Sequence, residues 1–546
     1  MLIRLIETLL VGLGNPLVDK AQQRRARRER PAVPSAPPSA DQVLLGQTVP
    51  IPAVSTFPHP LPGQAASPSA FSLSSAARRR HLYAIGSTGC GKTNLLLRLI
   101  EADIAAQHSF CVVDLRGDLV DRILLRLAQA KDPEEAGKHL LLLDLRERDH
   151  SVGFNPLNGT GDAYGRAFHT LDVLRQQADS WGIQLEETLR NALLALAETG
   201  WSLLEIEPLL CEPAFRQSVL SGVTDSQVRS FFARYGDLSE DRQTAWRLPV
   251  LNKVTPLLAI PGIRLMLGQR QGFSLPDLLD NSPGHIILIS LAVDRLHRAA
   301  HLVGGLLVSA LQTAIMARVD QPEEDRTPIN LYIDEFETMA TERFETILAE
   351  GRRFGLGLTL SHQNLSQLPQ ALRHAVLSNS QTQLYFQTGA TDAAELAREV
   401  ACAQPREWVR TSLIRQGVGE AFLVRRGEES VRLKVEHCPD PKASPFALDA
   451  LRSASFTAFA RPRAEAEREL QEREVWRRSL GDIESAYARA PAIIRRKKAV
   501  PAVQAAGLRE AAPEESSPSE DPTPPPTGPT YEIRHGKTGH FKPKQN

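Results

Sequence analysis

Short apolar runs alternate with amphipathic stretches over much of the chain. The runs Leu82–Ile85, Phe110–Asp114, Leu140–Asp144 and His285–Leu291 have the length of buried strands. After the first of them, Asn94–Ile100 has its apolar residues at helical spacing. Strands that alternate with helices predict a mostly parallel sheet with helices on both faces. The pattern therefore indicates an α/β fold.

The pattern changes to helices alone from about residue 170 to residue 279. Trp181–Thr199 is the clearest of these helices, and its leucines are explained by packing. Strand patterns then return, and Glu420–Arg426 and Ser430–Glu436 flank a Gly427 turn in the manner of a β-hairpin. We therefore expect an all-helical insertion in an α/β core that a hairpin closes.

The first 30 residues combine an apolar stripe with a basic cluster. Apolar residues between Leu2 and Leu13 recur at helical spacing, and six Lys and Arg residues follow between Lys20 and Arg30. This combination is typical of a peripheral membrane anchor, and equally of a helix that docks on a partner or on the core. Both interpretations stay open at this point.

Composition argues against several classes of protein. The 64 Lys and Arg residues balance 64 Asp and Glu residues, and the five cysteines include no C-x-x-C pair. This spacing argues against a disulfide framework or a cysteine-built metal site. We predict no transmembrane helix, and Arg4 and Glu7 interrupt the segment that a secretory signal would need. We therefore expect a cytoplasmic protein, with residues 1–30 as the candidate peripheral contact with the inner membrane.

One glycine-rich stretch carries the clearest chemical signal. It reads GSTGCGKT and matches G-x-x-x-x-G-K-[ST] between a predicted strand and a predicted helix. The backbone N–H groups of such a loop surround phosphate oxygens at the positive end of the helix. Lys92 can reach the outer phosphates, and the Thr93 hydroxyl can hold Mg²⁺. The predicted ATP-binding residues are Gly86, Ser87, Thr88, Gly89, Cys90, Gly91, Lys92, Thr93 and Asn94.

A second motif lies far downstream, where Asn330–Asp334 is an apolar strand that ends in two adjacent carboxylates. We expect this strand to lie beside the strand of the phosphate loop, which would bring Asp334 to Mg²⁺. Glu335 would then orient and deprotonate the attacking water. Hydrolysis needs a metal ligand and a separate general base, so the pair predicts an ATPase.

Two further polar elements follow this motif. Ser361–Gln363 ends the next predicted strand, where the Gln363 amide would sense the γ-phosphate or hold the water. Arg352 and Arg353 lie in the segment EGRRFG. They are interpreted either as a surface cluster or DNA phosphate clamp, or as an arginine finger supplied to a neighbouring subunit.

Together these stretches resemble the HerA/FtsK superfamily of RecA-like DNA-pumping ATPases, which includes the coupling proteins of type IV secretion and conjugation. The resemblance covers roughly Leu45 to Cys438 and rests on RRRHLYAIGSTGCGKTNLLLRLI, VVDLRGDLVDRIL, VGFNPL, YIDEFETM, ILAEGRRFGLGLTLSHQNLSQL and GEAFLVRRG. It implies a RecA-like P-loop NTPase fold and a homo-hexameric ring that moves DNA through a central pore. It also makes Asp334 and Glu335 the Walker B pair and Gln363 the sensor. Arg352 is then the better candidate for the finger, with Arg353 in reserve.

The resemblance and the shifts in composition divide the chain into seven parts. These are an amphipathic helix plus basic cluster (1–30), a Pro/Ala/Ser-rich linker with an edge strand near Val43–Leu45 (31–75), the first part of the RecA-like core (76–169), the all-helical insertion (170–279), the second part of the core (280–445), a charged helical extension (446–500) and a disordered tail (501–546). Membrane-spanning coupling proteins have N-terminal transmembrane helices and end-resection members have an N-terminal barrel, and this sequence predicts neither.

Three functions remain open on the sequence. The first is an ATP-driven DNA translocase of a conjugation-like or mobile-element transfer system. The second is a HerA-like DNA-processing motor that works with a nuclease. The third is a nucleotide-gated adaptor that recruits a protein cargo. The expected partners are DNA and a relaxase, a nuclease or a secretion channel.

Overall fold

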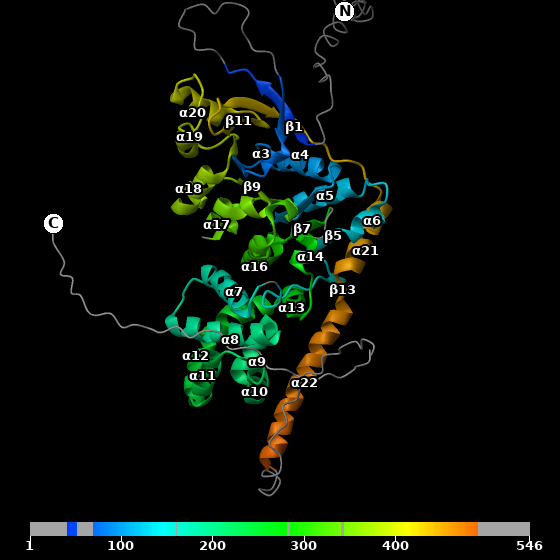
Figure 1. Ribbon diagram of the computed structural model, residues 1–546, viewed down its shortest axis with the longest axis vertical. Coiled ribbons are helices and arrows are strands. Elements are labelled where there is room, and N and C mark those ends of the chain that lie inside the picture. Colours follow the sequence, from blue (N-terminus) through cyan, green and yellow to red (C-terminus); the bar gives the residue numbers. More distant parts are fainter. Residues whose placement is uncertain (1–40, 52–68, 160, 281–283, 340–342, 490–546) are drawn as a thin grey trace, which may run out of the picture. The chain divides into compact units, whose positions relative to one another are not determined.

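An eleven-stranded sheet organises the described part of the chain (Figure 1). The computed structural model describes residues 41–51, 69–159, 161–280, 284–339 and 343–489, which belong to one structural unit, Met1–Ala490. The helix and basic cluster predicted for residues 1–30 and the tail predicted for 501–546 lie outside the described residues.

The strand order in the sheet is β2-β1-β12-β11-β10-β3-β9-β8-β4-β7-β5. The seven strands from β10 to β5 pair in parallel, whereas β11, β12, β1 and β2 add to one side in antiparallel pairs. The bounds are β1 Gln42–Val49, β2 Ala70–Ser74, β3 Leu82–Ile85, β4 Ser109–Asp114, β5 Leu140–Asp144, β7 Ile286–Ser290, β8 Ile329–Ile333, β9 Leu356–His362, β10 Thr382–Tyr385, β11 Glu420–Arg425 and β12 Val431–Val435. The predicted mostly parallel α/β sheet and the closing hairpin are confirmed.

The position of β8 corrects one expectation. β9 pairs with β3 on one side and with β8 on the other, so the strand that leads to Asp334 does not lie beside the strand of the phosphate loop. All seven residues of β9 are buried, as a central parallel strand requires. Chain order alone does not give the spatial order of parallel strands, because crossover connections can skip a neighbour.

Two strands lie inside the predicted 31–75 linker. β1 contains the predicted Val43–Leu45 strand, but it pairs with β12 and with β2, so β2 forms the edge. Val43 and Leu45 are buried on the core side of β1. β2 has only five residues and one of them is buried, which explains why its pattern in the sequence is weak.

Alternate residues of the parallel strands face two separate cores. In β4, Phe110 and Val112 pack with α4 and α5, whereas Cys111 and Val113 pack with α16. Because successive strand residues point to opposite faces, a strand that is covered on both sides is apolar throughout. This is why the sequence shows continuous apolar runs instead of alternation.

Helices cover both faces of the sheet (Figure 1). The core helices are α3 Ser75–Arg78, α4 Lys92–Ala105, α5 Asp118–Leu127, α6 Pro133–Lys138, α15 Val293–Leu296, α16 Arg298–Met316, α17 Arg343–Glu350, α18 Gln370–Asn379, α19 Ala390–Leu396 and α20 Arg406–Arg415. Among the described residues, the stretch Arg298–Asp320, which contains α16, has the length and composition of a membrane span. About two thirds of its most apolar window is buried inside the fold, which accounts for that composition.

The described residues between β6, His150–Ser151, and β7 contain helices and turns but no strand. The helices are α7 Ala163–Gln176, α8 Ile183–Thr199, α9 Ile206–Cys211, α10 Pro213–Leu220, α11 Ser226–Gly236, α12 Glu240–Leu258, α13 Pro261–Gly268 and α14 Leu275–Asp280. The all-helical insertion is therefore present and begins at α7, slightly before residue 170. After the hairpin, α21 Pro445–Phe459 packs on α6, and α22 Arg463–Arg489 packs on α10 and α13 of the insertion (Figure 1).

Candidate nucleotide site

Four neighbouring parallel strands end at one edge of the sheet. The strands β3, β9, β8 and β4 lie side by side, so the segments that follow them meet there. Those segments carry the phosphate loop, Gln363, the acidic pair and the turn Leu115–Gly117. The carboxyl edge of a parallel sheet is the usual place for a ligand in this class of fold.

The phosphate loop curls around the start of α4. The Lys92 ammonium group donates hydrogen bonds to the backbone oxygens of Gly86 (2.6 Å) and Ser87 (3.0 Å). Gly91 has φ +115°, and a Cβ there would lie 3.1 Å from the backbone of Gly419. The N–H of Gly419 in turn donates to the carbonyl oxygen of Cys90 (2.7 Å). The segment before β11 therefore fixes the outer side of the loop, and Gly91 has both a conformational and a steric reason to be glycine.

Asp334 lies at the centre of the site. Its Oδ2 accepts a hydrogen bond from the Thr93 hydroxyl (3.3 Å), and its Oδ1 accepts one from the Ser361 hydroxyl (2.6 Å). Burial raises the pKa of Asp334, while the Ser361 hydrogen bond and the charge of Lys92 act in the opposite direction. The structure brings Thr93 and Asp334 together across the intervening strand β9, which supplies Ser361. The sequence placed Ser361 at the end of a strand but gave it no role, because no strand was expected between β3 and β8.

Glu335 is held beside Asp334 in a strained backbone conformation. Its φ of +53° is rare for a residue with a side chain, and such strain concentrates at functional sites. Glu335 Oε1 accepts a hydrogen bond from Gln363 Nε2 (3.1 Å), and Gln363 Oε1 accepts one from the Thr88 hydroxyl (3.2 Å). Gln363 thus bridges the phosphate loop and the carboxylate, as a residue that senses the outer phosphate would.

Arg116 is a further member of the site that the sequence reasoning did not identify. Its Nη2 lies 3.3 Å from Glu335 Oε1. The buried Asp114 carboxylate accepts the backbone N–H groups of Arg116, Leu119 and Val120, and this holds the turn that presents Arg116. Burial raises the pKa of Asp114, and its backbone hydrogen bonds oppose the rise. An aspartate directly before Leu-Arg-Gly at the end of a buried strand is the signal that could have revealed this turn.

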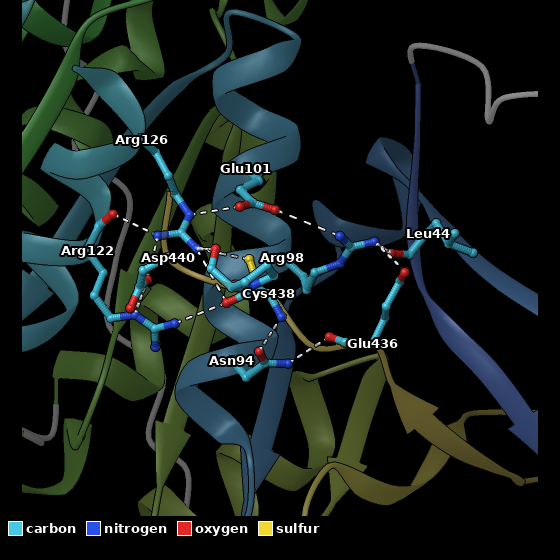
Figure 2. Close-up of polar contacts among 10 residues, drawn as sticks. Leu44, Asn94, Arg98, Glu101, Arg122, Arg126, Glu436, Cys438 and Asp440 are labelled. Carbon is cyan, nitrogen blue, oxygen red and sulfur yellow. Dashed lines mark hydrogen bonds and ion pairs between the residues drawn. The ribbon is translucent and has the colours of Figure 1, made fainter. Parts of the chain in front are cut away.

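Asn94 lies in the predicted loop, but its side chain has a different role. Nδ2 donates to the carbonyl oxygen of Glu436, and Oδ1 accepts the N–H of Cys438, both at 2.8 Å. Figure 2 shows this amide pointing at the segment that follows β12. The Asn94 side chain is therefore engaged by this segment, and the predicted contact of Asn94 with ATP stays a prediction. Its backbone N–H still belongs to the first turn of α4, where such groups lack a partner within the helix.

The same segment after β12 is tied to α4 and α5 by arginines (Figure 2). Arg126, only 5% exposed at its side chain, pairs with Glu101 (2.8 Å) and Asp440 (3.0 Å). It also donates to the carbonyl oxygen of Pro439 (3.0 Å). Arg98 donates to the carbonyl oxygen of Leu44 (3.0 Å) and pairs with Glu436. These contacts fasten the hairpin to the helix that begins at the phosphate loop.

Arg352 and Arg353 lie far from the candidate site of the same chain. Both are exposed in the turn Gly351–Phe354, directly before β9, whereas Gln363 directly follows β9. Seven extended residues at about 3.3 Å each separate the two ends by about 20 Å. Burial and, to a lesser degree, the charge of Arg352 lower the pKa of His81, which precedes β3 at the same edge as Arg352. The structure therefore does not bring these arginines to the acidic pair of the same chain.

The donor set at Thr93 and Asp334 fits Mg²⁺. The ion prefers hard oxygen ligands and keeps several waters, so one hydroxyl and one carboxylate suffice for the protein's share. A buried carboxylate whose pKa is raised by desolvation is also stabilised by a cation. Within the described residues, the Lys92 ammonium group donates to carbonyl oxygens of its own loop, and an anionic phosphate is a better partner for this charge.

Residues 67–133 and 245–405 match the family model described as the type IV secretion-system coupling protein DNA-binding domain. The two matched stretches contain the phosphate loop, the acidic pair and Gln363, while residues 134–244 lie between them. No curated protein matches the sequence at a significant level.

Solved structures of similar fold are also found. The bacterial conjugative coupling protein TrwBdeltaN70, in an unbound form, has 18% sequence identity and a TM-score of 0.51, covering 68% of this chain and 88% of that one. The plasmid coupling protein TrwB in complex with ADP and Mg²⁺ has 16% identity and a TM-score of 0.48, with 68% and 89% coverage. VirB4 of Thermoanaerobacter pseudethanolicus has 12% identity and a TM-score of 0.41, with 67% and 90% coverage. The similarity to TrwBdeltaN70 shows that this chain has the RecA-like P-loop fold.

Proposed function

We propose that this chain is an ATP-driven DNA translocase of the coupling type, acting in a conjugation-like or mobile-element DNA transfer system. The observation that carries the proposal is the convergence of Lys92, Thr93, Asp334, Glu335 and Gln363 at one edge of the sheet. The match of both motif-bearing stretches to the coupling-protein domain supports the choice of DNA as the substrate that is moved.

The proposed ATP site assigns each of these side chains a task. Lys92 exchanges its carbonyl partners for the outer phosphates, and Thr93 and Asp334 hold Mg²⁺. The ion, when bound, neutralises charge on the phosphates. Glu335 orients the attacking water and accepts its proton, and Gln363 positions Glu335 according to the state of the γ-phosphate.

Arg352 is proposed to act in the site of a neighbouring subunit. The length of β9 prevents it from serving its own site, whereas a ring would place the amino edge of one sheet near the nucleotide of the next. A homo-hexamer, expected from the family resemblance, is therefore part of the proposal, with Arg353 as the alternative finger. A peripheral inner-membrane contact through residues 1–30 and a relaxase, nuclease or channel partner belong to the same proposal.

The test is ATP hydrolysis with and without DNA. A motor predicts strong stimulation by DNA that Glu335→Gln abolishes, while the exposed hairpin variant Glu429→Gln behaves as the wild type. Slow hydrolysis that is indifferent to DNA would contradict the motor and favour the nucleotide-gated adaptor. Lys92→Ala should abolish ATP binding in either case.

The shared site has its own test. Arg352→Ala should leave ATP binding intact and reduce turnover by about 10³-fold, while the exposed Arg406→Ala has little effect. Mixing Arg352→Ala with Glu335→Gln subunits should restore part of the activity, because some sites then combine an intact Glu335 with an intact Arg352. No restoration at any mixing ratio would contradict a finger supplied in trans.

A further inference from the structure

A pocket of about 390 Å³ lies where the helical insertion meets the core, away from the phosphate loop. Its walls come from residues 154–159, from α7, from residues 270–276 and from α16. This volume lies near the lower end of the range of about 300–1,000 Å³ that holds small ligands. The walls from residues 154–159 and from α7 belong to residues 134–244, which the coupling-protein family model does not match.

Two arginines line this pocket. They are Arg166 and Arg270, and no Asp or Glu lies among the described lining residues. The Arg166 guanidinium group donates hydrogen bonds to carbonyl oxygens, among them those of Leu157 (2.8 Å) and Ala197 (3.2 Å). Carbonyls satisfy its hydrogen bonds without cancelling its charge. Burial lowers the pKa of Arg166, and the charge of Asp162 opposes this fall. The charged groups that line the pocket are thus cationic, which favours an anion.

Arg270 is the cation best placed to bind such an anion. Its Nε donates to the carbonyl oxygen of Gly200 (3.0 Å), and its guanidinium group stacks over the Trp201 ring at 4.5 Å. Within the described residues, neither Nη group of Arg270 has a hydrogen-bond partner. Arg270 is exposed, and these two contacts orient its guanidinium group while its outer N–H groups remain available for a planar or tetrahedral oxyanion.

A buried hydroxyl supplies a second, independent sign of a ligand. Ser309 on α16 lines the pocket, is only 6% exposed, and its Oγ has no hydrogen-bond partner among the described residues. One turn later, the Thr313 hydroxyl lies 2.6 Å from His169 Nδ1. Buried hydroxyls without a partner are rare, because leaving one unsatisfied costs about 1–3 kcal/mol. A ligand oxygen or nitrogen would satisfy this one.

Two aromatic rings form another part of the lining. Phe154 and Phe273 both line the pocket and stack on each other, with ring centroids 5.8 Å apart and planes 14° from parallel. Phe154 is buried, while Phe273 is partly exposed. Aromatic walls beside cationic groups are suited to a ring that carries a phosphate.

We propose that this pocket binds a single nucleotide unit, with the phosphate at Arg270 and the base against the Phe154–Phe273 wall. Two sources share this chemistry: a free mononucleotide that would bind as an effector, and an unpaired nucleotide of a DNA strand. The site is distinct from the phosphate loop and does not depend on ATP hydrolysis. Its place between the insertion and α16 would let an occupant tie the insertion to the core.

The experiment uses the full chain with Lys92→Ala, so that the phosphate loop does not contribute to binding. Titration calorimetry measures the binding of dAMP and of a short oligodeoxyadenylate, and competition between them. Arg270→Gln should weaken binding about tenfold, the effect of losing one charge-assisted hydrogen bond, and Ser309→Ala should weaken it about threefold. The control is Arg264→Gln, an exposed arginine on α13 outside this pocket. Thermal melting of each variant verifies that it is folded.

The outcomes separate the two sources of the nucleotide. Binding of dAMP that the oligonucleotide does not compete for supports a free effector. Arg270-dependent binding of the oligonucleotide that dAMP displaces supports a DNA strand. Absence of saturable binding of both probes, or an effect of Arg270→Gln no larger than that of Arg264→Gln, overturns the proposal. Because Lys92 is already replaced, none of these results bears on the proposed ATPase.

Discussion

Replacing Arg116 with alanine removes a cation that holds Glu335 Oε1 at 3.3 Å. The Arg116 side chain is 51% exposed, and ion pairs of such exposure contribute about 0.2–1 kcal/mol. If this pair must break before Glu335 can act on water, its loss lowers the barrier by at most about 1 kcal/mol. That corresponds to an increase of up to about fivefold in the rate of hydrolysis without DNA.

The assay is steady-state ATP hydrolysis without DNA, with two matched variants. Arg116→Lys keeps a cation near Glu335 and should stay close to the wild-type rate, and the exposed Arg148→Ala should not change it. The Asp114 turn does not depend on the Arg116 side chain, since it is held through backbone N–H groups. A fall of tenfold or more in Arg116→Ala would refute the reasoning, because Arg116 would then stabilise the reaction itself. An unchanged rate would show that the ion pair does not restrain Glu335.

Three further predictions concern stability and the loop. Burial lowers the pKa of His81 from 6.5 to about 4, and the His81 Nδ1 accepts the N–H of Leu358. Between pH 6.5 and pH 4 the unfolded chain therefore binds a proton at His81 that the folded chain does not bind. Stability should therefore fall as the pH drops from 6.5 towards 4, and His81→Asn should flatten this loss in thermal melts; an equal slope in both proteins would contradict it. Arg126→Met should cost about 2 kcal/mol in urea unfolding, because Glu101 and the carbonyl oxygen of Pro439 lose the buried guanidinium group, while Asp440 keeps its ion pair with Arg122 (2.6 Å). A cost below about 0.5 kcal/mol would contradict the network's role. Gly91→Ala should weaken ATP binding by about tenfold or more, and by more than the same change at Gly89, where a Cβ meets nothing within 4 Å; equal losses would contradict the role assigned to the Gly419 contact.

The strands and the two motifs could be predicted because each depends on residues close in sequence. Phe110–Asp114 and Leu140–Asp144 are apolar runs whose burial on both faces is visible residue by residue, and they are strands in the structure. The phosphate loop is likewise a local arrangement of glycines between a strand and a helix. The helical insertion was predicted because its leucines keep a helical period over a hundred residues.

Other features depend on which strands become neighbours, and the sequence does not encode this locally. Ser361 contacts Asp334 only because β9 lies between β3 and β8. Arg116 reaches Glu335 only because β4 is the next strand on the other side of β8. Asn94 was assigned to the nucleotide by its place in the motif. In the structure its side-chain amide forms hydrogen bonds with Glu436 and Cys438, in the segment after β12. Contacts between distant segments decided each of these cases.

Thr93 and Asp334 provide the most direct test of the central claim, that they share one Mg²⁺ bound to ATP. A thiolate ligates Mg²⁺ poorly and ligates softer ions such as Cd²⁺ better. Thr93→Cys and Asp334→Cys should therefore each lose hydrolysis with Mg²⁺ and regain part of it when Cd²⁺ is added. Thr88→Cys, whose hydroxyl contacts Gln363 instead, should show no such change of metal preference. Recovery in neither cysteine variant, or in only one of them, would contradict the account.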